Sequence, residues 1–235
     1  PELFTVVLAA MVFNGDIVIT INGESYDAMK YEQLIKLPLE ELMDFSHIKK
    51  PSDLPLPALR ELFQLFDISQ GMLNPDALEK AGIGQLNLKS QQALQEVVTI
   101  THEMKDGFPI LDTTILSKAE VAEKRDQLNK LKDFLQHIQI YNTSAKLKNF
   151  KYSVDEVKSY AESLELVAQL NKLKKRSEEV TKAANYIVNA QYHLPSSHDW
   201  QIQAEEAIGN LIDALKQGEE IQAELKEVQR LKTEY

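Results

Sequence analysis

The sequence predicts a mainly α-helical protein that carries one small antiparallel β-hairpin. Glycine and proline are scarce, with eight of each in 235 residues, which argues against an all-β sandwich or a loop-rich enzyme. Apolar side chains recur every three to four residues through long stretches of the second half, as they do along the buried face of a helix. One β-branched run ends at Asn22-Gly23, the strongest short signal for a hairpin because both turn positions need a positive φ.

The N-terminal residues are expected to form a helix followed by the hairpin. Residues 2–13 should be helical, since Pro1 is well tolerated at a helix start and Asn14-Gly15 supplies a stop. This apolar run is too short to cross a bilayer, so we expect a buried helix rather than a signal or membrane anchor. Residues 17–21 and 24–28 should form the two strands. A helix that leads into a hairpin is also the outline of a winged-helix wing.

Short helices are expected to follow, separated by prolines. Residues 31–44 should form one or two of them, because Pro38 removes a backbone donor and breaks the helix. A stiff connector precedes a helix at residues 57–66; its prolines are Pro51, Pro55 and Pro57.

Asn74-Pro75-Asp76 should cap a further short helix, which Gly82 and Gly84 are expected to break. Residues 88–105 predict an amphipathic helix. Its inward side chains are expected to be Leu88, Ala93, Leu94, Val97, Val98 and Met104.

The best internal boundary lies at residues 107–112. The predicted domains are a small helical domain with the hairpin at residues 1–110 and an elongated helical bundle or coiled-coil arm at residues 112–235.

Residues 117–120 and 153–156 match the capping box, in which a serine and a glutamate satisfy backbone N–H groups at a helix start. The first helix should run to about Tyr141 and the second to about Tyr192. The first should bury Val121, Leu128, Leu131, Phe134, Leu135 and Ile138.

Residues 194–197 should turn the chain, and residues 199–232 should form a matching long helix. Two long helices joined by a short loop lie antiparallel. Trp200, the only tryptophan, should pack the tip of this arm. The apolar seam of the last helix comprises Ala204, Ala207, Ile208, Leu211, Leu215, Gly218, Ile221, Leu225 and Val228.

The charge of the chain argues against nucleic-acid binding over most of its length. The net charge is −10, of which −7 falls in residues 1–100. Residues 140–176 carry eight basic and four acidic side chains, so a contact with nucleic acid or an acidic protein is one alternative there. The simpler interpretation is that these side chains pair with glutamates four residues away. The basic residues are Lys146, Lys148, Lys151, Lys158, Lys172, Lys174, Lys175 and Arg176.

The sequence contains no nucleotide-binding or catalytic motif. Gly82-Ile83-Gly84 lacks the third glycine of a dinucleotide fingerprint, and no Gly-Lys-Ser/Thr of a P-loop occurs. His102 lacks the second histidine of the metalloprotease motif. Adjacent carboxylates on helices point about 100° apart and should be solvated; they are Glu40-Glu41, Glu178-Glu179, Glu205-Glu206 and Glu219-Glu220.

His193, His198 and Asp199 are close enough in sequence to converge as a metal or acid–base site. The simpler interpretation is that Asp199 and His193 complement helix dipoles. Cysteine is absent, which excludes disulfides and thiolate chemistry and fits a cytoplasmic setting. We therefore predict no catalytic, cofactor-binding or metal-binding residue and no enzymatic activity for this chain.

Four groups of short stretches carry a resemblance: Leu8 to Val18 with Tyr26-Asp27-Ala28, Leu39 to Ile48 with Pro51, Leu54 to Phe66 with Gly71, and Leu194-Pro195 with His198-Asp199-Trp200. They resemble the later, helical part of very large bacterial and archaeal ATP-binding proteins. These form a family of unknown function related to the PglY and BrxC ATPases of phage-exclusion (BREX/Pgl) islands. The resemblance implies that the nucleotide-binding core lies upstream in the same polypeptide, and no functional residue carries over because the Walker residues have no counterpart here.

The chain is expected to be a segment of a longer protein, because it begins at Pro1 and ends within a helical pattern. We expect a non-catalytic assembly or partner-binding region of a larger ATPase-linked, phage-defence-type protein. Its partners should be proteins or other domains of the same chain, not a membrane. The alternatives are a stand-alone helical adaptor or oligomerisation module, and an enzyme that uses the loop at residues 193–199.

Overall fold

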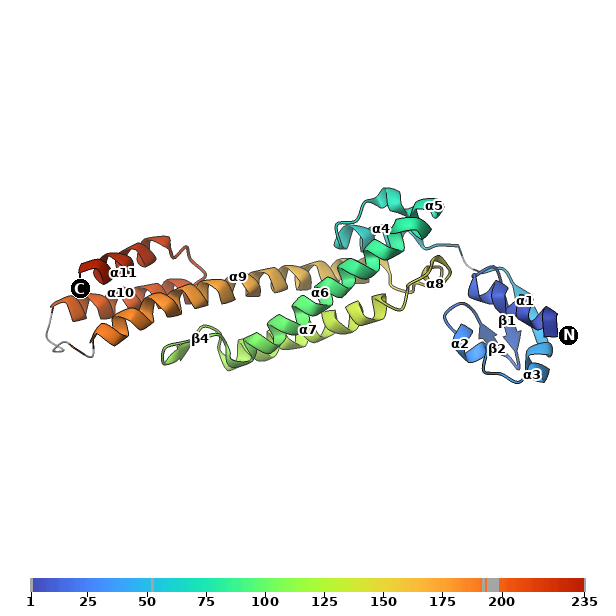
Figure 1. The fold of residues 1–235 in the computed structure, drawn as a ribbon, viewed down its shortest axis with the longest axis horizontal. Coiled ribbons are helices and arrows are strands. Elements are labelled where there is room, and N and C mark those ends of the chain that lie inside the picture. Colours follow the sequence, from blue (N-terminus) through green and yellow to red (C-terminus); the bar gives the residue numbers. More distant parts are fainter. Residues whose placement is uncertain (1, 52, 192, 194–198, 235) are drawn as a thin grey trace. The chain divides into compact units, whose positions relative to one another are not determined.

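The computed structural model is mainly helical with a small antiparallel sheet near the N-terminus, which confirms the predicted fold class (Figure 1). The structure describes residues 2–51, 53–191, 193 and 199–234. The chain divides into two compact units, one of Pro1–Leu94 with Asp133–Glu162, the other of Gln95–Lys132 with Ser163–Tyr235. The predicted division at residues 107–112 stays a prediction.

The first unit begins with a helix packed on a three-stranded sheet. Helix α1 (Glu2–Phe13) precedes the predicted hairpin of β1 (Val18–Ile21) and β2 (Glu24–Tyr26). Asn22 and Gly23 have φ values of 50° and 82°, as a type I′ turn requires. The buried cluster between the layers comprises Val12, Ile19, Ile21, Tyr26 and Leu34.

A third strand, β3 (Phe45–Lys49), pairs antiparallel with β1 on the side opposite β2. This strand was not predicted because the sequence Phe45-Ser46-His47-Ile48-Lys49 shows no apolar alternation; in the structure Phe45 is half-buried and the next four side chains are exposed. The short helices α2 (Tyr31–Leu34) and α3 (Leu39–Met43) flank Pro38, as predicted.

The prediction that Gly82 and Gly84 break the helix is wrong. Helices α4 (Leu56–Leu65) and α5 (Pro75–Ala77) are followed by one π-helical turn, η2 (Leu78–Gly82), that leads directly into α6 (Ile83–Glu103). A Cβ atom at Gly82 would lie 2.9 Å from the carbonyl oxygen of Met72, in the 3₁₀ turn η1 (Gln70–Leu73). Gly82 therefore permits close packing rather than ending a helix.

The inward face predicted for α6 is partly wrong. Val97 and Met104 are buried, but Leu88 and Val98 are 56% and 49% exposed. Helix α6 starts five residues earlier than predicted, so the apolar face was assigned over too short a window.

Both capping boxes are confirmed. The Ser117 amide donates to the Glu120 carboxylate at 2.8 Å, and the Ser153 amide donates to the Glu156 carboxylate at 2.7 Å. They open α7 (Lys118–Ile138) and α9 (Val154–Gln191), and α8 (Ser144–Leu147) lies between. All the side chains predicted to face inward on α7 are buried.

The predicted single helix over residues 199–232 is wrong, because the chain forms α10 (Asp199–Lys216) and α11 (Gln222–Glu234). Gly218 adopts a φ of 74°. The Glu219 amide donates to the Ala214 carbonyl at 2.9 Å and the Gly218 amide to the Leu215 carbonyl at 3.2 Å, which is the Schellman motif of a helix end. The predicted turn at residues 194–197 lies outside the described residues.

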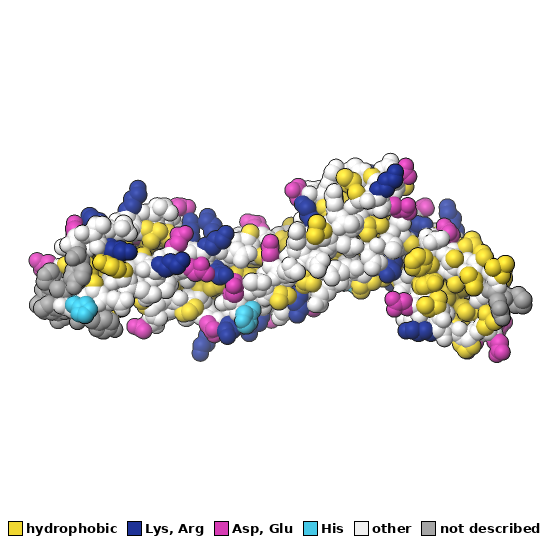
Figure 2. Space-filling view, viewed as in Figure 1, with side chains coloured by type: hydrophobic (Ala, Val, Ile, Leu, Met, Phe, Trp, Pro, Cys, Tyr) yellow, Lys and Arg dark blue, Asp and Glu magenta, His cyan; other side chains and the backbone are white. Residues whose placement is uncertain are grey.

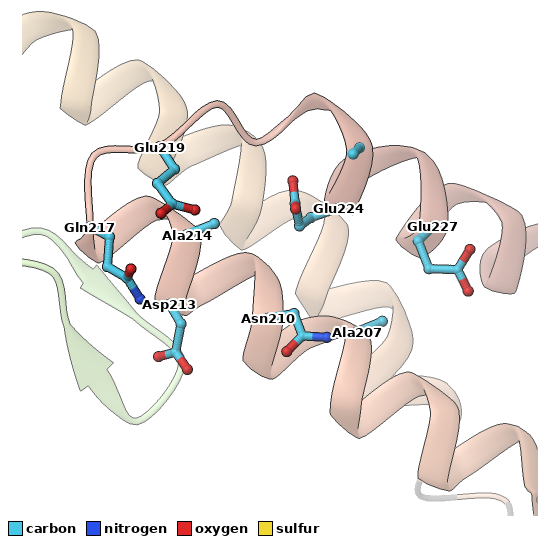
Figure 3. A pocket seen from close by; sticks show the side chains of 9 residues that line it. Ala207, Asn210, Asp213, Ala214, Gln217, Glu219, Glu224 and Glu227 are labelled. Atoms are coloured by element: carbon cyan, nitrogen blue, oxygen red, sulfur yellow. The ribbon is translucent and has the colours of Figure 1, made fainter.

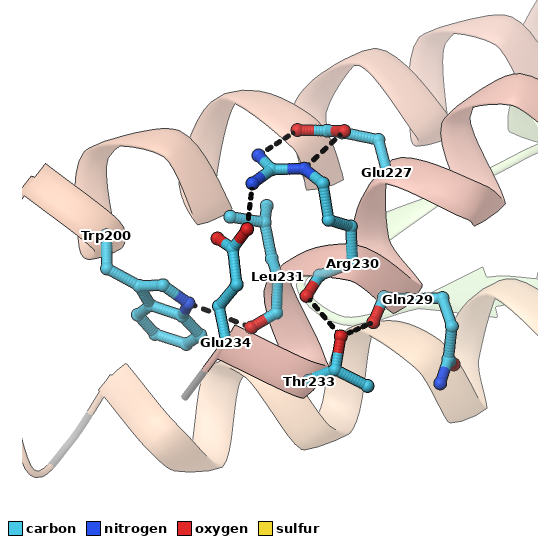
Figure 4. Close-up of polar contacts among 7 residues, drawn as sticks. All are labelled: Trp200, Glu227, Gln229, Arg230, Leu231, Thr233 and Glu234. Carbon is cyan, nitrogen blue, oxygen red and sulfur yellow. Dashed lines mark hydrogen bonds and ion pairs between the residues drawn. The ribbon is translucent and has the colours of Figure 1, made fainter.

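Helices α10 and α11 pack along the C-terminal part of α9 (Figure 1). The indole N–H of Trp200 on α10 donates to the carbonyl oxygen of Leu231 on α11 at 2.9 Å (Figure 4). The Lys232 ammonium lies 4.6 Å from the ring centre of Tyr186 on α9. Strands β4 (Pro109–Ile110) and β5 (Thr113–Thr114) form a second hairpin in this unit, after the 3₁₀ turn η3 (Met104–Asp106).

Candidate protein-interaction surface

The structure describes only part of the loop at residues 193–199, which the sequence offered as a possible metal or acid–base site. His193 is exposed, and its amide donates to the Ala190 carbonyl at 3.1 Å beyond the end of α9. Asp199 is the exposed first residue of α10. His198 lies outside the described residues. Within the described part of the chain, no three His, Asp or Glu side chains are placed to hold a metal ion.

Part of the basic stretch is engaged in ion pairs. The Lys174 ammonium lies 2.7 Å from Glu103 and 3.7 Å from Glu178, and its hydrogen bond to Glu103 is the main cause of its raised pKa. The Arg176 guanidinium contacts Glu220 at 3.2 Å and donates to the Glu219 carbonyl. The pairing with Glu178 is the predicted i,i+4 pair.

An acidic groove of about 540 Å³ lies between α10 and α11 (Figure 3). Ala207, Ala214 and Ala223 are among its lining residues, so small side chains leave the groove open. No histidine, serine or threonine lines it, and its titratable side chains are carboxylates. Glu227 is bound to Arg230 at 2.6 Å (Figure 4). The other polar lining residues are Asn210, Asp213, Gln217, Glu219 and Glu224.

The most distinctive surface lies on α1. We define the outer apolar stripe as Leu3, Val6, Val7, Ala10 and Phe13, all exposed. Their spacings of three and four residues place them along one side of the helix. The opposite side, with Thr5, Leu8 and Val12, is buried within the chain.

The exposure is large for apolar side chains. Leu3 is 78% exposed, Val6 is 65% exposed and Phe13 is 51% exposed. The expectation that this helix is buried is therefore correct for one side only. The sequence showed that the helix is apolar all round but not which side the chain itself covers.

Further exposed apolar residues surround α1. The Phe4 ring lies 6.2 Å from that of Phe45, and the Phe13 ring lies 4.9 Å from that of Tyr31. Figure 2 shows hydrophobic side chains gathered over the α1–α3 region. Among the described residues, nine exposed large hydrophobic side chains fall in residues 1–50 and seven in residues 55–235. The apolar surface is thus concentrated in about a fifth of the chain.

No described helix has both the length and the apolar character needed to cross a membrane.

Comparison with protein families divides the chain in the proline-containing connector after β3. A model described as the fifth domain of a family of unknown function, DUF6079, matches residues 55–235. The chain belongs to the DUF6079 family. A model of the fourth domain of DUF6079 matches residues 1–50, so the outer apolar stripe of this DUF6079 chain lies in the fourth domain. No curated protein and no solved structure matches the chain.

Proposed function

We propose that this DUF6079 chain is a non-catalytic, protein-binding assembly region of a larger ATPase-linked protein of the phage-exclusion type. The outer apolar stripe carries the protein-binding part of the proposal. It is apolar along its whole length, and charged residues are likewise depleted at the centre of protein interfaces. A contiguous exposed apolar patch is also a common mark of an interaction site.

The ATPase-linked part of the proposal is supported by sequence. Residues 8–18, 39–48 and 54–66 resemble the helical part of ATP-binding proteins related to PglY and BrxC. The 235 residues contain no P-loop, so ATP binding in such a protein would belong to another region. The helical units of this chain would then supply assembly contacts.

Binding between this chain and the remainder of its full-length protein, expressed separately, tests the proposal. The remainder should hydrolyse ATP, and this chain should bind to that remainder. Replacing Leu3, Val6 and Val7 with glutamine should weaken binding by at least about tenfold, because burying each such side chain is worth about 1.5–3 kcal/mol. Isothermal titration calorimetry measures the affinity.

A matched control uses three exposed apolar residues that lie outside the stripe, Leu88, Val98 and Ile202. Their replacement with glutamine should leave the affinity unchanged. ATP hydrolysis by this chain alone would contradict the proposal. Self-association of this chain without binding to the remainder would favour a stand-alone oligomerisation module instead.

A further inference from the structure

We infer that the outer apolar stripe is covered by a helix of the domain that directly precedes residues 1–50 in the same polypeptide. This inference rests on the proposed function, since it names the partner of the proposed binding surface. Three observations carry it: the spacing of the stripe, its lack of charge, and the domain numbering of the family.

The spacing of the stripe fits a helical partner. Leu3, Val6 or Val7, Ala10 and Phe13 follow the alternating three- and four-residue steps of a helix–helix seam. Its opposite side includes the buried Leu8 and Val12, and Val12 belongs to the cluster with β1 residues Ile19 and Ile21. Helix α1 is therefore a middle layer, with the sheet on one side and no layer of the described chain accounting for the other. A helix that is apolar all round is normally buried.

The lack of charge fits a permanent partner. No charged residue occurs from Leu3 to Phe13. Obligate interfaces resemble a domain core cut in half, whereas partners that meet and separate use charges for steering and specificity. A seam without charges lacks one of the main means of rejecting wrong free partners. A partner that stays attached needs no such selection.

The family numbering names a partner that is always attached. The model that matches residues 1–50 is that of a fourth domain, so a third domain comes immediately before it in the order of the family. Helix α1 is the first element of the matched region. A helix of the third domain would meet α1 within the same molecule, at an effective concentration set by the segment that links them and in the millimolar range for a short flexible one.

Photocrosslinking in the full-length protein tests this inference. The photoreactive residue p-benzoyl-L-phenylalanine in place of Val6 reacts with C–H groups in direct contact, and the same residue in place of the exposed Gln33 on α2 is the control. Mass spectrometry identifies the joined peptides. Mixed isotope-labelled and unlabelled protein separates links within one chain from links between copies. Circular dichroism confirms that both variants are folded.

We expect the position of Val6 to join to peptides of the preceding domain within the same chain, at least tenfold more than the position of Gln33. Links between copies, links to a different protein, links only to later parts of the same chain, or no links would each overturn the inference. A link to a different protein would leave the proposed function standing. The proposed function is tested separately by the calorimetric titration, in which it would fail if this chain did not bind to the remainder of the protein.

Discussion

A methyl group has no room at Gly82, because a Cβ atom there would lie 2.9 Å from the Met72 carbonyl oxygen and 3.2 Å from a methyl of Leu78. Neither the backbone oxygen nor the turn that holds it can move without disturbing the packing. We expect Gly82→Ala to lower the free energy of unfolding by about 1–3 kcal/mol, as overpacking does. Urea denaturation followed by circular dichroism measures this.

Gly84 is the matched control. No atom lies within 4 Å of a Cβ built at Gly84, and this residue lies in the first turn of α6. Gly84→Ala should therefore raise the free energy of unfolding by up to about 1 kcal/mol. If Gly82→Ala stabilised the chain as Gly84→Ala should, the close packing at Gly82 would be refuted.

Tyr152 should make the free energy of unfolding decrease at alkaline pH. Burial raises its pKa to about 12, whereas tyrosine in an unfolded chain ionises near pH 10. The unfolded chain loses this proton first as pH rises. The contribution of Tyr152 to the free energy of unfolding is therefore full below about pH 10 and is lost between about pH 10 and 12. The Tyr152 hydroxyl also lies 2.7 Å from His137 Nδ1.

Tyr152→Phe isolates this effect. At pH 8 the variant should be less stable by about 1 kcal/mol, because it lacks the hydrogen bond to His137. The difference from the wild type should shrink or reverse by pH 12. Denaturation curves at several pH values measure both quantities, and a constant difference across this range would contradict the prediction.

At the scale of elements, Gly218 separates α10 from α11. Its φ of 74° is costly for any residue with a Cβ atom, by about 1–2 kcal/mol. Gly218→Ala should lower the free energy of unfolding by about that amount. Trp200, buried against α11, is the only tryptophan, so its fluorescence reports the α10–α11 contact during denaturation.

Gly209 provides the comparison within α10. A Cβ atom at Gly209 would meet nothing within 4 Å, so Gly209→Ala should raise stability by up to about 1 kcal/mol. A stabilising effect of Gly218→Ala of similar size would show that the two helices can join into one.

Elements with local signals were predictable from sequence, and elements defined by distant contacts were not. The capping boxes and the Asn22-Gly23 turn depend on neighbouring residues alone, and all three formed. The break at Gly218 was missed because Leu215, Gly218 and Ile221 continue the helical spacing of the predicted seam. That spacing gives no sign of the Schellman hydrogen bonds that end α10. Strand β3 was missed because its pairing with β1 spans the two helices α2 and α3.

The sequence predicted the apolar helix that carries the candidate surface, but not which side of that helix is exposed. The sequence shows that α1 is apolar on every side, which indicates a buried helix. Which side the chain itself covers depends on the packing of residues such as Val12 against the sheet, and periodicity cannot reveal it when apolar residues occur on every side. The outer apolar stripe therefore emerged only from the three-dimensional structure.

At the scale of the whole molecule, charge argues against nucleic-acid binding. The net charge of −10 repels phosphates, and Lys174 and Arg176 already contact carboxylates. We expect no band shift with duplex DNA or RNA at about 50 mM salt, where such binding is strongest. A salt-sensitive shift that disappears in a Lys172→Ala/Lys175→Ala variant would contradict this and identify the exposed lysines as the contact.

The π-helical turn η2 (Leu78–Gly82) constrains the length of the chain. A π-turn holds one residue more than the α-helical turn it replaces. Removing one residue there would restore an uninterrupted α-helix but rotate everything before it by about 100° around the axis of α6. The contact of Gly82 with Met72 would then be lost. An insertion or deletion that a surface loop tolerates is thus forbidden here, and related chains should keep the same number of residues between Asn74 and Ile83.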